Sequence, residues 1–166
     1  MMKLQVSHLK DGLYTDHLLD AAAAFGFENP DDFTEKVKVD VQIDKRDRDY
    51  YIKLNVKTQI ELTCDRCLEQ YSLAIDDNCS VLFTPNEKLI TEDSEFVRLI
   101  ADNPRELEID TDVRETVLLG IPIKAICSES CKGLCQCGQN LNISACTCAD
   151  EKIDPRWEAL KKLKKI

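Results

Sequence analysis

Cysteine spacing constrains this chain more than any other sequence feature. Eight of the nine cysteines lie at the short spacings that metal ligands show. Cys64 and Cys67 form a C-x-x-C pair, and six more crowd into a 22-residue stretch: Cys127, Cys131, Cys135, Cys137, Cys146 and Cys148. Thiolate sulfurs are soft ligands that select zinc or iron–sulfur clusters. The spacing therefore predicts a protein that is held together by metal.

Length and charge restrict the class of protein. A chain of 166 residues fits one domain, or one domain with a small appended module. Its 31 acidic and 22 basic side chains give a net charge of −9. Such a body does not attract duplex nucleic acid through its overall field, so any nucleic-acid contact needs a local basic patch.

The N-terminus and the hydropathy pattern bear on the compartment. The first 19 residues lack a charged stretch followed by an apolar run, so we expect no signal peptide. No segment approaches the roughly 18 apolar residues of a membrane span. We therefore expect a cytoplasmic protein without a membrane partner, whose cysteines bind metal or do redox work rather than form disulfides. The odd cysteine count also disfavours a fully paired disulfide framework.

Residues 36–83 alternate between apolar and polar side chains, which is the pattern of half-buried strands. The alternation predicts strands from Val37 to Ile43 and from Ile52 to Leu62. A third strand follows from Tyr71 to Phe83, and Cys79 on its inward phase is interpreted as a small core residue. We predict an α+β fold whose body is an antiparallel sheet or partial barrel with a few helices, followed by a cysteine-rich, metal-bound C-terminal segment.

The other elements are predicted from shorter signals. Residues 3–9 fit a strand, the alanine-rich stretch 16–25 favours a helix, and 84–104 fits an irregular excursion. A short strand is expected over 106–109, followed by a helix capped by Asp110 or Thr111 that continues to about Leu119. These patterns divide the chain into a β-rich body (1–126), a cysteine-rich segment (127–150) and a basic amphipathic helix (151–166) with Trp157, Leu160 and Leu163 on one face.

The cysteines can be grouped into two four-sulfur sites. Cys64 and Cys67, at a turn between two predicted strands, combine with Cys127 and Cys131 into a closed, structural zinc site. A possible second site consists of Cys135, Cys137, Cys146 and Cys148. Two alternatives stay open: one metal draws on both sets and leaves spare thiols, or the cysteines hold an iron–sulfur cluster. A thioredoxin-like role for Cys64 and Cys67 is disfavoured, because their flanks are strand-like rather than helical.

Other chemistry is scarce in this sequence. His8 and His17 are the two histidines, the glycines are scattered, and no phosphate-binding loop or nucleophile–base set can be assembled. The sequence therefore predicts neither an enzyme nor a small-molecule substrate. Basic residues near the cysteines and at the C-terminal end are candidates for contact with RNA or a partner protein: Arg66, Lys132, Arg156, Lys161, Lys162, Lys164 and Lys165.

Three passages resemble the YceD family, the large ribosomal RNA subunit accumulation proteins of bacteria and plastids. They are LTCDRCL at 62–68, the cysteine passage from Pro122 to Cys148, and DPRW at 154–157 before a Leu- and Lys-rich end. The family's second set has C-x-x-C-G, whereas Cys135-Gln136-Cys137-Gly138 is one residue shorter.

The resemblance implies a non-enzymatic factor that supports accumulation of large-subunit ribosomal RNA during ribosome assembly, with one or two structural zinc ions. Its partner would be pre-ribosomal RNA or a ribosomal protein, and the net charge of −9 favours a basic ribosomal protein. Two other classes stay open: a zinc-ribbon adaptor in another nucleic-acid complex, and an iron–sulfur or redox protein.

Overall fold

A computed structural model describes residues 3–90, 96–146 and 148 of this chain. Its main element is a five-stranded sheet in the order β2-β3-β4-β5-β6. The five strands are β2 (Gly12–Asp20), β3 (Val37–Arg46), β4 (Asp49–Thr63), β5 (Gln70–Thr84) and β6 (Val97–Leu99). A separate two-stranded sheet pairs β1 (Lys3–Gln5) with β7 (Glu106–Glu108). Helix α1 (Asp110–Gly120) follows β7.

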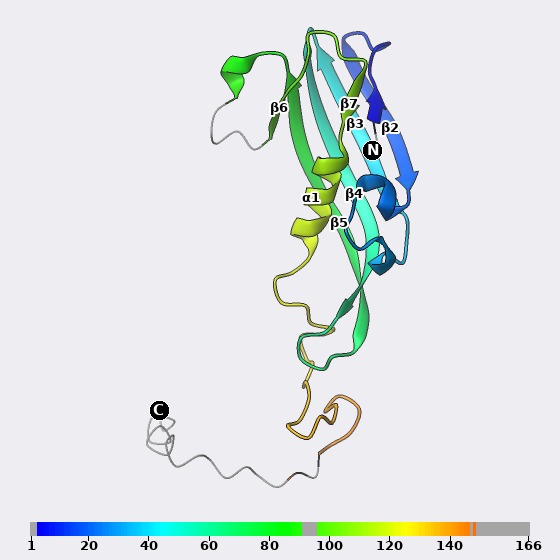
Figure 1. Cartoon of the computed structure of the whole chain (residues 1–166), viewed down its shortest axis with the longest axis vertical. Helices are drawn as coiled ribbons and strands as arrows, with labels where there is room; N and C mark the ends of the chain where they lie inside the picture. Colours follow the sequence, from blue (N-terminus) through cyan, green and yellow to red (C-terminus); the bar gives the residue numbers. More distant parts are fainter. Residues whose placement is uncertain (1–2, 91–95, 147, 149–166) are drawn as a thin grey trace, which may run out of the picture.

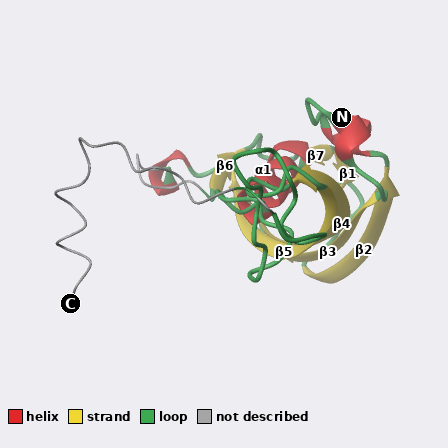
Figure 2. Cartoon of the chain, turned by 90° about the horizontal axis from the view of Figure 1, so that it is seen from below, coloured by secondary structure: helices red, strands yellow, loops and turns green. Residues whose placement is uncertain are grey.

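The sheet curves around α1 (Figure 2). Alternate residues of β3 and β4 face inward, among them Val39, Ile52 and Leu54, each with at most 1% of its surface exposed. Val113 and Val117 of α1 complete this core with no exposed surface at all. One apolar face per strand therefore produces both the predicted alternation and the buried interior.

The predicted strands are confirmed, but the partial barrel is not. Strands β3 to β5 pair antiparallel, as predicted. Strand β2, which the sequence did not predict, adds antiparallel to β3, and β6 pairs parallel to β5 within the stretch predicted as irregular. Among the described residues the sheet ends at β2 on one side and at β6 on the other, so it is not closed. The short strand predicted over 106–109 is present as β7, and the strand predicted over 3–9 is limited to Lys3–Gln5.

The helix predicted over residues 16–25 is wrong. Asp16–Asp20 belongs to β2 and pairs with Val37–Val41 of β3, while Ala22–Phe25 forms a single 3-10 turn. A short alanine run is a marginal helix by itself, and backbone pairing along a whole strand outweighs its propensity. Two further 3-10 turns cover Pro30–Asp32 and Glu87–Leu89. The helix predicted near 110–119 is confirmed as α1, but its N-cap is Ile109, which gives no side-chain hydrogen bond.

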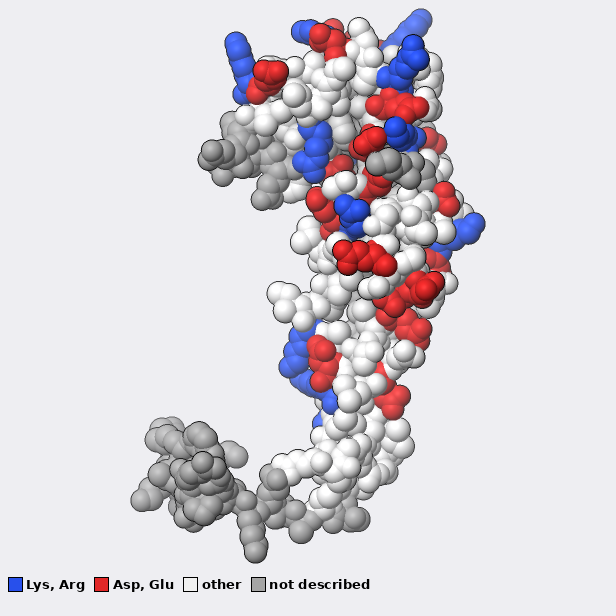
Figure 3. Space-filling model, viewed as in Figure 1, with Lys and Arg blue, Asp and Glu red and all other residues white. Residues whose placement is uncertain are grey.

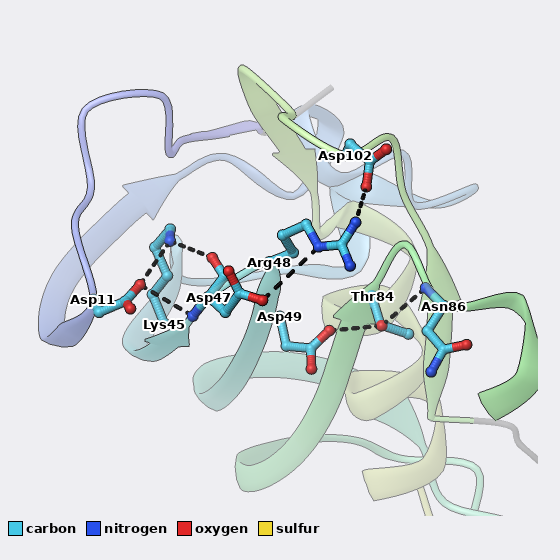
Figure 4. Close-up of polar contacts among 8 residues, drawn as sticks. All are labelled: Asp11, Lys45, Asp47, Arg48, Asp49, Thr84, Asn86 and Asp102. Carbon is cyan, nitrogen blue, oxygen red and sulfur yellow. Dashed lines mark hydrogen bonds and ion pairs between the residues drawn. The ribbon is translucent and has the colours of Figure 1, made fainter.

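Polar contacts join the loops at one end of the sheet (Figure 4). Lys45 binds Asp11 at 3.0 Å, Arg48 binds Asp102 at 2.9 Å, and the hydroxyl of Thr84 donates to Asp49 at 2.6 Å. Strand β4 begins at this end with Asp49 and runs for 15 residues to Thr63. The cysteine turn after Thr63 therefore lies at the opposite end of the sheet (Figure 1).

Some predictions fall outside the described part of the chain. The helix predicted over 151–166, with Arg156 and the four candidate lysines, belongs to this group, and it stays a prediction. The segment boundaries after residues 126 and 150 also stay predictions. Among the described residues, no helix is both long and apolar enough to cross a bilayer.

Candidate metal centre

The first cysteine pair sits in the turn that joins β4 to β5. The backbone N–H of Cys64 donates to the carbonyl oxygen of Glu69 at 2.9 Å, and that of Leu68 donates to the carbonyl oxygen of Cys64 at the same distance. Leu68 closes the turn with a φ of 60°, in the left-handed region. This compact turn holds the side chains of Cys64 and Cys67 in a buried position.

A second segment, residues 125–134, pairs with this turn through backbone and side-chain hydrogen bonds. Asp65 donates its backbone N–H to the carbonyl oxygen of Ala125 at 2.7 Å, and its carboxylate accepts the N–H of Ala125 at 2.8 Å. Farther along, the N–H of Leu134 donates to the carbonyl oxygen of Arg66 at 3.0 Å. These contacts bring Cys127 and Cys131 to the first cysteine pair.

The four sulfurs of this first cluster converge on one point. All four lie within 4.8 Å of one another. The sulfurs of Cys64 and Cys131 are 3.9 Å apart, and those of Cys67 and Cys127 are 3.7 Å apart. A tetrahedron with metal–sulfur bonds of about 2.3 Å has sulfur–sulfur edges of about 3.8 Å. The spacing fits four ligands of one metal ion and is far longer than the roughly 2.05 Å of a disulfide bond.

Burial supports a closed site in the first cluster. Cys64, Cys67 and Cys131 form a small buried group of their own, against which Tyr71 and Ile126 pack. Cys127 is the exposed member. Three thiols buried away from the main core contribute little apolar area, so the packing alone leaves this end weakly stabilised. A bound metal ion would supply the missing free energy.

Hydrogen bonds prepare some of these thiols for ionisation. The backbone N–H of Cys127 donates to the sulfur of Cys64 at 3.4 Å. Together with the backbone N–H groups of Cys67 and Arg66, it lowers the pKa of Cys64 to about 6. The side-chain amide of Asn142 donates to the sulfur of Cys131 at 3.3 Å and lowers the pKa of that thiol. Because the thiolate is the form that binds metal, both contacts favour ligation at neutral pH.

A second cluster consists of Cys135, Cys137, Cys146 and Cys148, whose sulfurs also lie within 4.8 Å of one another. The sulfurs of Cys137 and Cys146 are 3.5 Å apart, and the N–H of Cys148 donates to the sulfur of Cys146 at 3.2 Å. The Cys135-Gln136-Cys137 spacing is one residue shorter than C-x-x-C, but it does not prevent the four sulfurs from converging. Cys137 and Cys148 are exposed, so this cluster is more open than the first.

The backbone around the second cluster is a tight turn. The N–H of Gly138 donates to the carbonyl oxygen of Cys135 at 2.8 Å, and Gly138 has a φ of 86°. A backbone hydrogen bond from Gln139 and contacts with the other thiols of the cluster lower the pKa of Cys137 to about 7. The ninth cysteine, Cys79, lies outside both clusters and packs against the main core, as the strand pattern predicts.

Three residues that sequence reasoning did not single out hold the clusters in place. Asn142 accepts the N–H of Lys132 with the side-chain oxygen at 2.8 Å while its amide group donates to Cys131. Gly133 has a φ of 76°, and a Cβ added there would lie 3.0 Å from the carbonyl oxygen of Arg66. Asp65 forms the two-bond pair with Ala125. The one available signal was residue type, since Gly, Asn and Asp favour turns and local backbone hydrogen bonds.

The structure gives Arg66 a role inside the centre. Its Nη1 donates to the carbonyl oxygen of Cys131 at 2.9 Å and to that of Glu129 at 3.3 Å. The guanidinium therefore fastens the loop between Cys127 and Cys131 to the β4–β5 turn. Lys132, the other described member of the basic set, is exposed.

Comparison with known proteins points to one family. A family model described as "Large ribosomal RNA subunit accumulation protein YceD" matches residues 52–164. Two chloroplastic plant proteins named "Large ribosomal RNA subunit accumulation protein YCED homolog 1" are similar to the chain. The Arabidopsis thaliana protein is 29% identical over 92% of this chain and 57% of its own length. The Zea mays protein is 28% identical over 59% of this chain and 43% of its own length.

The chain thus spans about half the length of the curated relatives it matches. No solved structure matches it.

Proposed function

Because the chain belongs to the YceD family of large ribosomal RNA subunit accumulation proteins, we propose that it is a non-enzymatic factor supporting large-subunit rRNA accumulation. In this proposal the factor acts during ribosome assembly, in a reducing compartment such as the cytoplasm where thiols stay free to bind metal. The structural observation that supports metal binding by this factor is the convergence of four sulfurs from two segments 60 residues apart.

We further propose that the metal in the first cluster is zinc. The sulfur spacing supports a single ion, because thiolates that bind different irons of an iron–sulfur cluster lie farther apart than four ligands of one atom. When bound, the ion would join the β4–β5 turn to residues 125–134. Cys64, Cys67, Cys127 and Cys131 would hold it, and the second cluster would hold a second ion.

A basic ribosomal protein is the partner that charge favours over bare RNA. The chain carries a net charge of −9, and Figure 3 shows acidic side chains spread over the sheet body. On the same face the cysteine segment presents a mostly uncharged surface. Acidic surface attracts basic protein and repels phosphate. Contact of Lys132 or the C-terminal lysines with RNA stays a prediction.

Depletion of the protein in its source organism tests the proposed function. We expect large-subunit rRNA to fall relative to small-subunit rRNA, and a wild-type copy to restore it. A Cys64→Ser/Cys67→Ser double variant should fail to restore it, while Cys79→Ser, which removes a cysteine outside both clusters, should succeed. An unchanged rRNA ratio after depletion would overturn the proposal.

Gradient sedimentation separates this function from a zinc-ribbon adaptor. A factor of large-subunit assembly is expected to sediment with large-subunit precursors. An adaptor of another nucleic-acid complex would sediment apart from them.

A further inference from the structure

An apolar groove opens beside the C-terminal half of α1. It has a volume of about 490 Å³ and lies between α1, the end of β4 and the loop that follows Phe25. Phe33, Ile60, Leu62, Leu118 and Ile121 line it. Leu118 is 53% exposed although it is a large apolar residue. The volume falls within the range of about 300–1,000 Å³ that is typical of binding sites.

Acidic side chains border this groove. Glu28 and Asp32 are part of the lining, and Asp31 lies beside Asp32 in the same exposed loop. Arg114 is the one cation among the described lining residues, and its Nη1 donates to the carbonyl oxygen of Gly26 at 3.3 Å. The groove thus combines an apolar floor with a negative rim.

We propose that this groove binds a basic segment of a partner protein, which inserts an apolar side chain between Leu118 and Phe33. The proposal rests on the proposed function and names the surface through which a ribosomal protein would bind. An apolar anchor flanked by lysine or arginine complements both parts of the groove. Nucleic acid does not complement the rim, because acidic side chains repel phosphate.

A partner fits this groove better than the chain's own C-terminal residues. Residues 151–166 include Trp157, Leu160 and several lysines, so their composition would also suit it. However, the chain leaves the groove at Ile121 and runs away from it into the cysteine segment (Figure 1). The cysteine segment, the last described part of the chain, therefore lies away from the groove.

Site-specific crosslinking tests the proposal with a closely matched control. A photo-reactive amino acid replaces Leu118 in one full-length protein and Leu119 in another. Leu119 is the next residue of α1, is 84% exposed, and lines a different hollow with Phe96 and Cys79. Each protein is mixed with the proteins and the rRNA extracted from purified large ribosomal subunits and then irradiated. We expect position 118, but not 119, to crosslink to a lysine- or arginine-rich segment of one ribosomal protein.

Binding of that ribosomal protein is then measured for two substitutions. Leu118→Lys should weaken it about tenfold or more, because an apolar anchor contact is lost and a like charge is added. Leu119→Lys introduces the same side chain outside the groove and should stay within about twofold of wild type. Both positions are exposed, so thermal unfolding of the two variants should match wild type and exclude misfolding as the cause.

Several results would overturn the groove proposal. One is the absence of any crosslink at position 118. Another is a crosslink from position 118 to residues 151–166, to a second copy of the chain or to RNA. A third is an equal loss of ribosomal-protein binding in the Leu118→Lys and Leu119→Lys variants. The rRNA ratio keeps this test separate from that of the proposed function. If depletion lowers large-subunit rRNA but position 118 does not crosslink to a ribosomal protein, the groove proposal fails and the proposed function stands. If depletion leaves the ratio unchanged, the proposed function fails.

Discussion

The two segments of the first cluster approach closely at Gly133, so Gly133→Ala is a sharp test of their packing. The residue has a φ of 76°, which an alanine adopts only with strain. Its new Cβ would lie 3.0 Å from the carbonyl oxygen of Arg66. That oxygen accepts the N–H of Leu134 at 3.0 Å, so it cannot move away without loss of this hydrogen bond.

The expected cost has two parts. The left-handed conformation costs an alanine about 1–2 kcal/mol. Forcing the Arg66 backbone aside costs about 1–3 kcal/mol more, as for other overpacked sites. The sum is roughly 2–5 kcal/mol. Since 1.4 kcal/mol is tenfold in an equilibrium constant, zinc affinity of the first cluster should fall by about 30-fold to a few thousandfold.

Stepwise transfer of zinc to a chromophoric chelator measures this loss. Gly138→Ala is the matched control, because Gly138 has a φ of 86° but no atom within 4 Å of the added Cβ. It should cost the second cluster only the strain of about 1–2 kcal/mol. A Gly133→Ala protein with wild-type zinc affinity, or equal costs for the two alanines, would refute the close approach.

Three further predictions concern the same centre. Cys64→Ser should lose one zinc ion and have a lower unfolding temperature, whereas Cys79→Ser should keep its full metal content. Elemental analysis and thermal melts measure both effects. A Cys64→Ser protein with unchanged zinc content and unfolding temperature would show that Cys64 binds no metal. Asn142→Ala removes the hydrogen bond to the sulfur of Cys131 and should weaken zinc binding about 10- to 100-fold, measured by chelator competition; no change would exclude that role. Arg66→Ala removes the guanidinium that donates to the carbonyl oxygens of Glu129 and Cys131. The zinc-bound protein should be destabilised by about 1–3 kcal/mol, measured by denaturant unfolding. A variant as stable as wild type would show that these hydrogen bonds do not hold the loop in place.

Local periodicity explains which parts of the fold were predictable. The strands β3, β4 and β5 each expose one face to water, so the sequence alternates and their positions can be read from it. Residues 16–20 carry no such pattern, and their strand conformation depends on pairing with β3, a partner that local propensity cannot show. The parallel pairing of β6 with β5 is likewise a long-range contact.

The same distinction holds within the metal centre. Cysteine spacing pointed to two four-sulfur sets, because ligands of one ion must lie close together in space. The parts played by Gly133, Arg66 and Asn142 depend on where the β4–β5 turn meets residues 125–142. That meeting is set by contacts between segments some 60 residues apart, so no pattern within either segment reveals it.

In our proposal, Cys64, Cys67, Cys127 and Cys131 hold one zinc ion that joins two distant segments. Native mass spectrometry of protein purified without chelators, compared with the Cys64→Ser/Cys67→Ser variant, tests it most directly. We expect zinc in the wild-type protein and the loss of one ion in the variant, with any ion of the second cluster retained. A wild-type chain without metal, a mass that corresponds to an iron–sulfur cluster, or equal zinc in both proteins would contradict it.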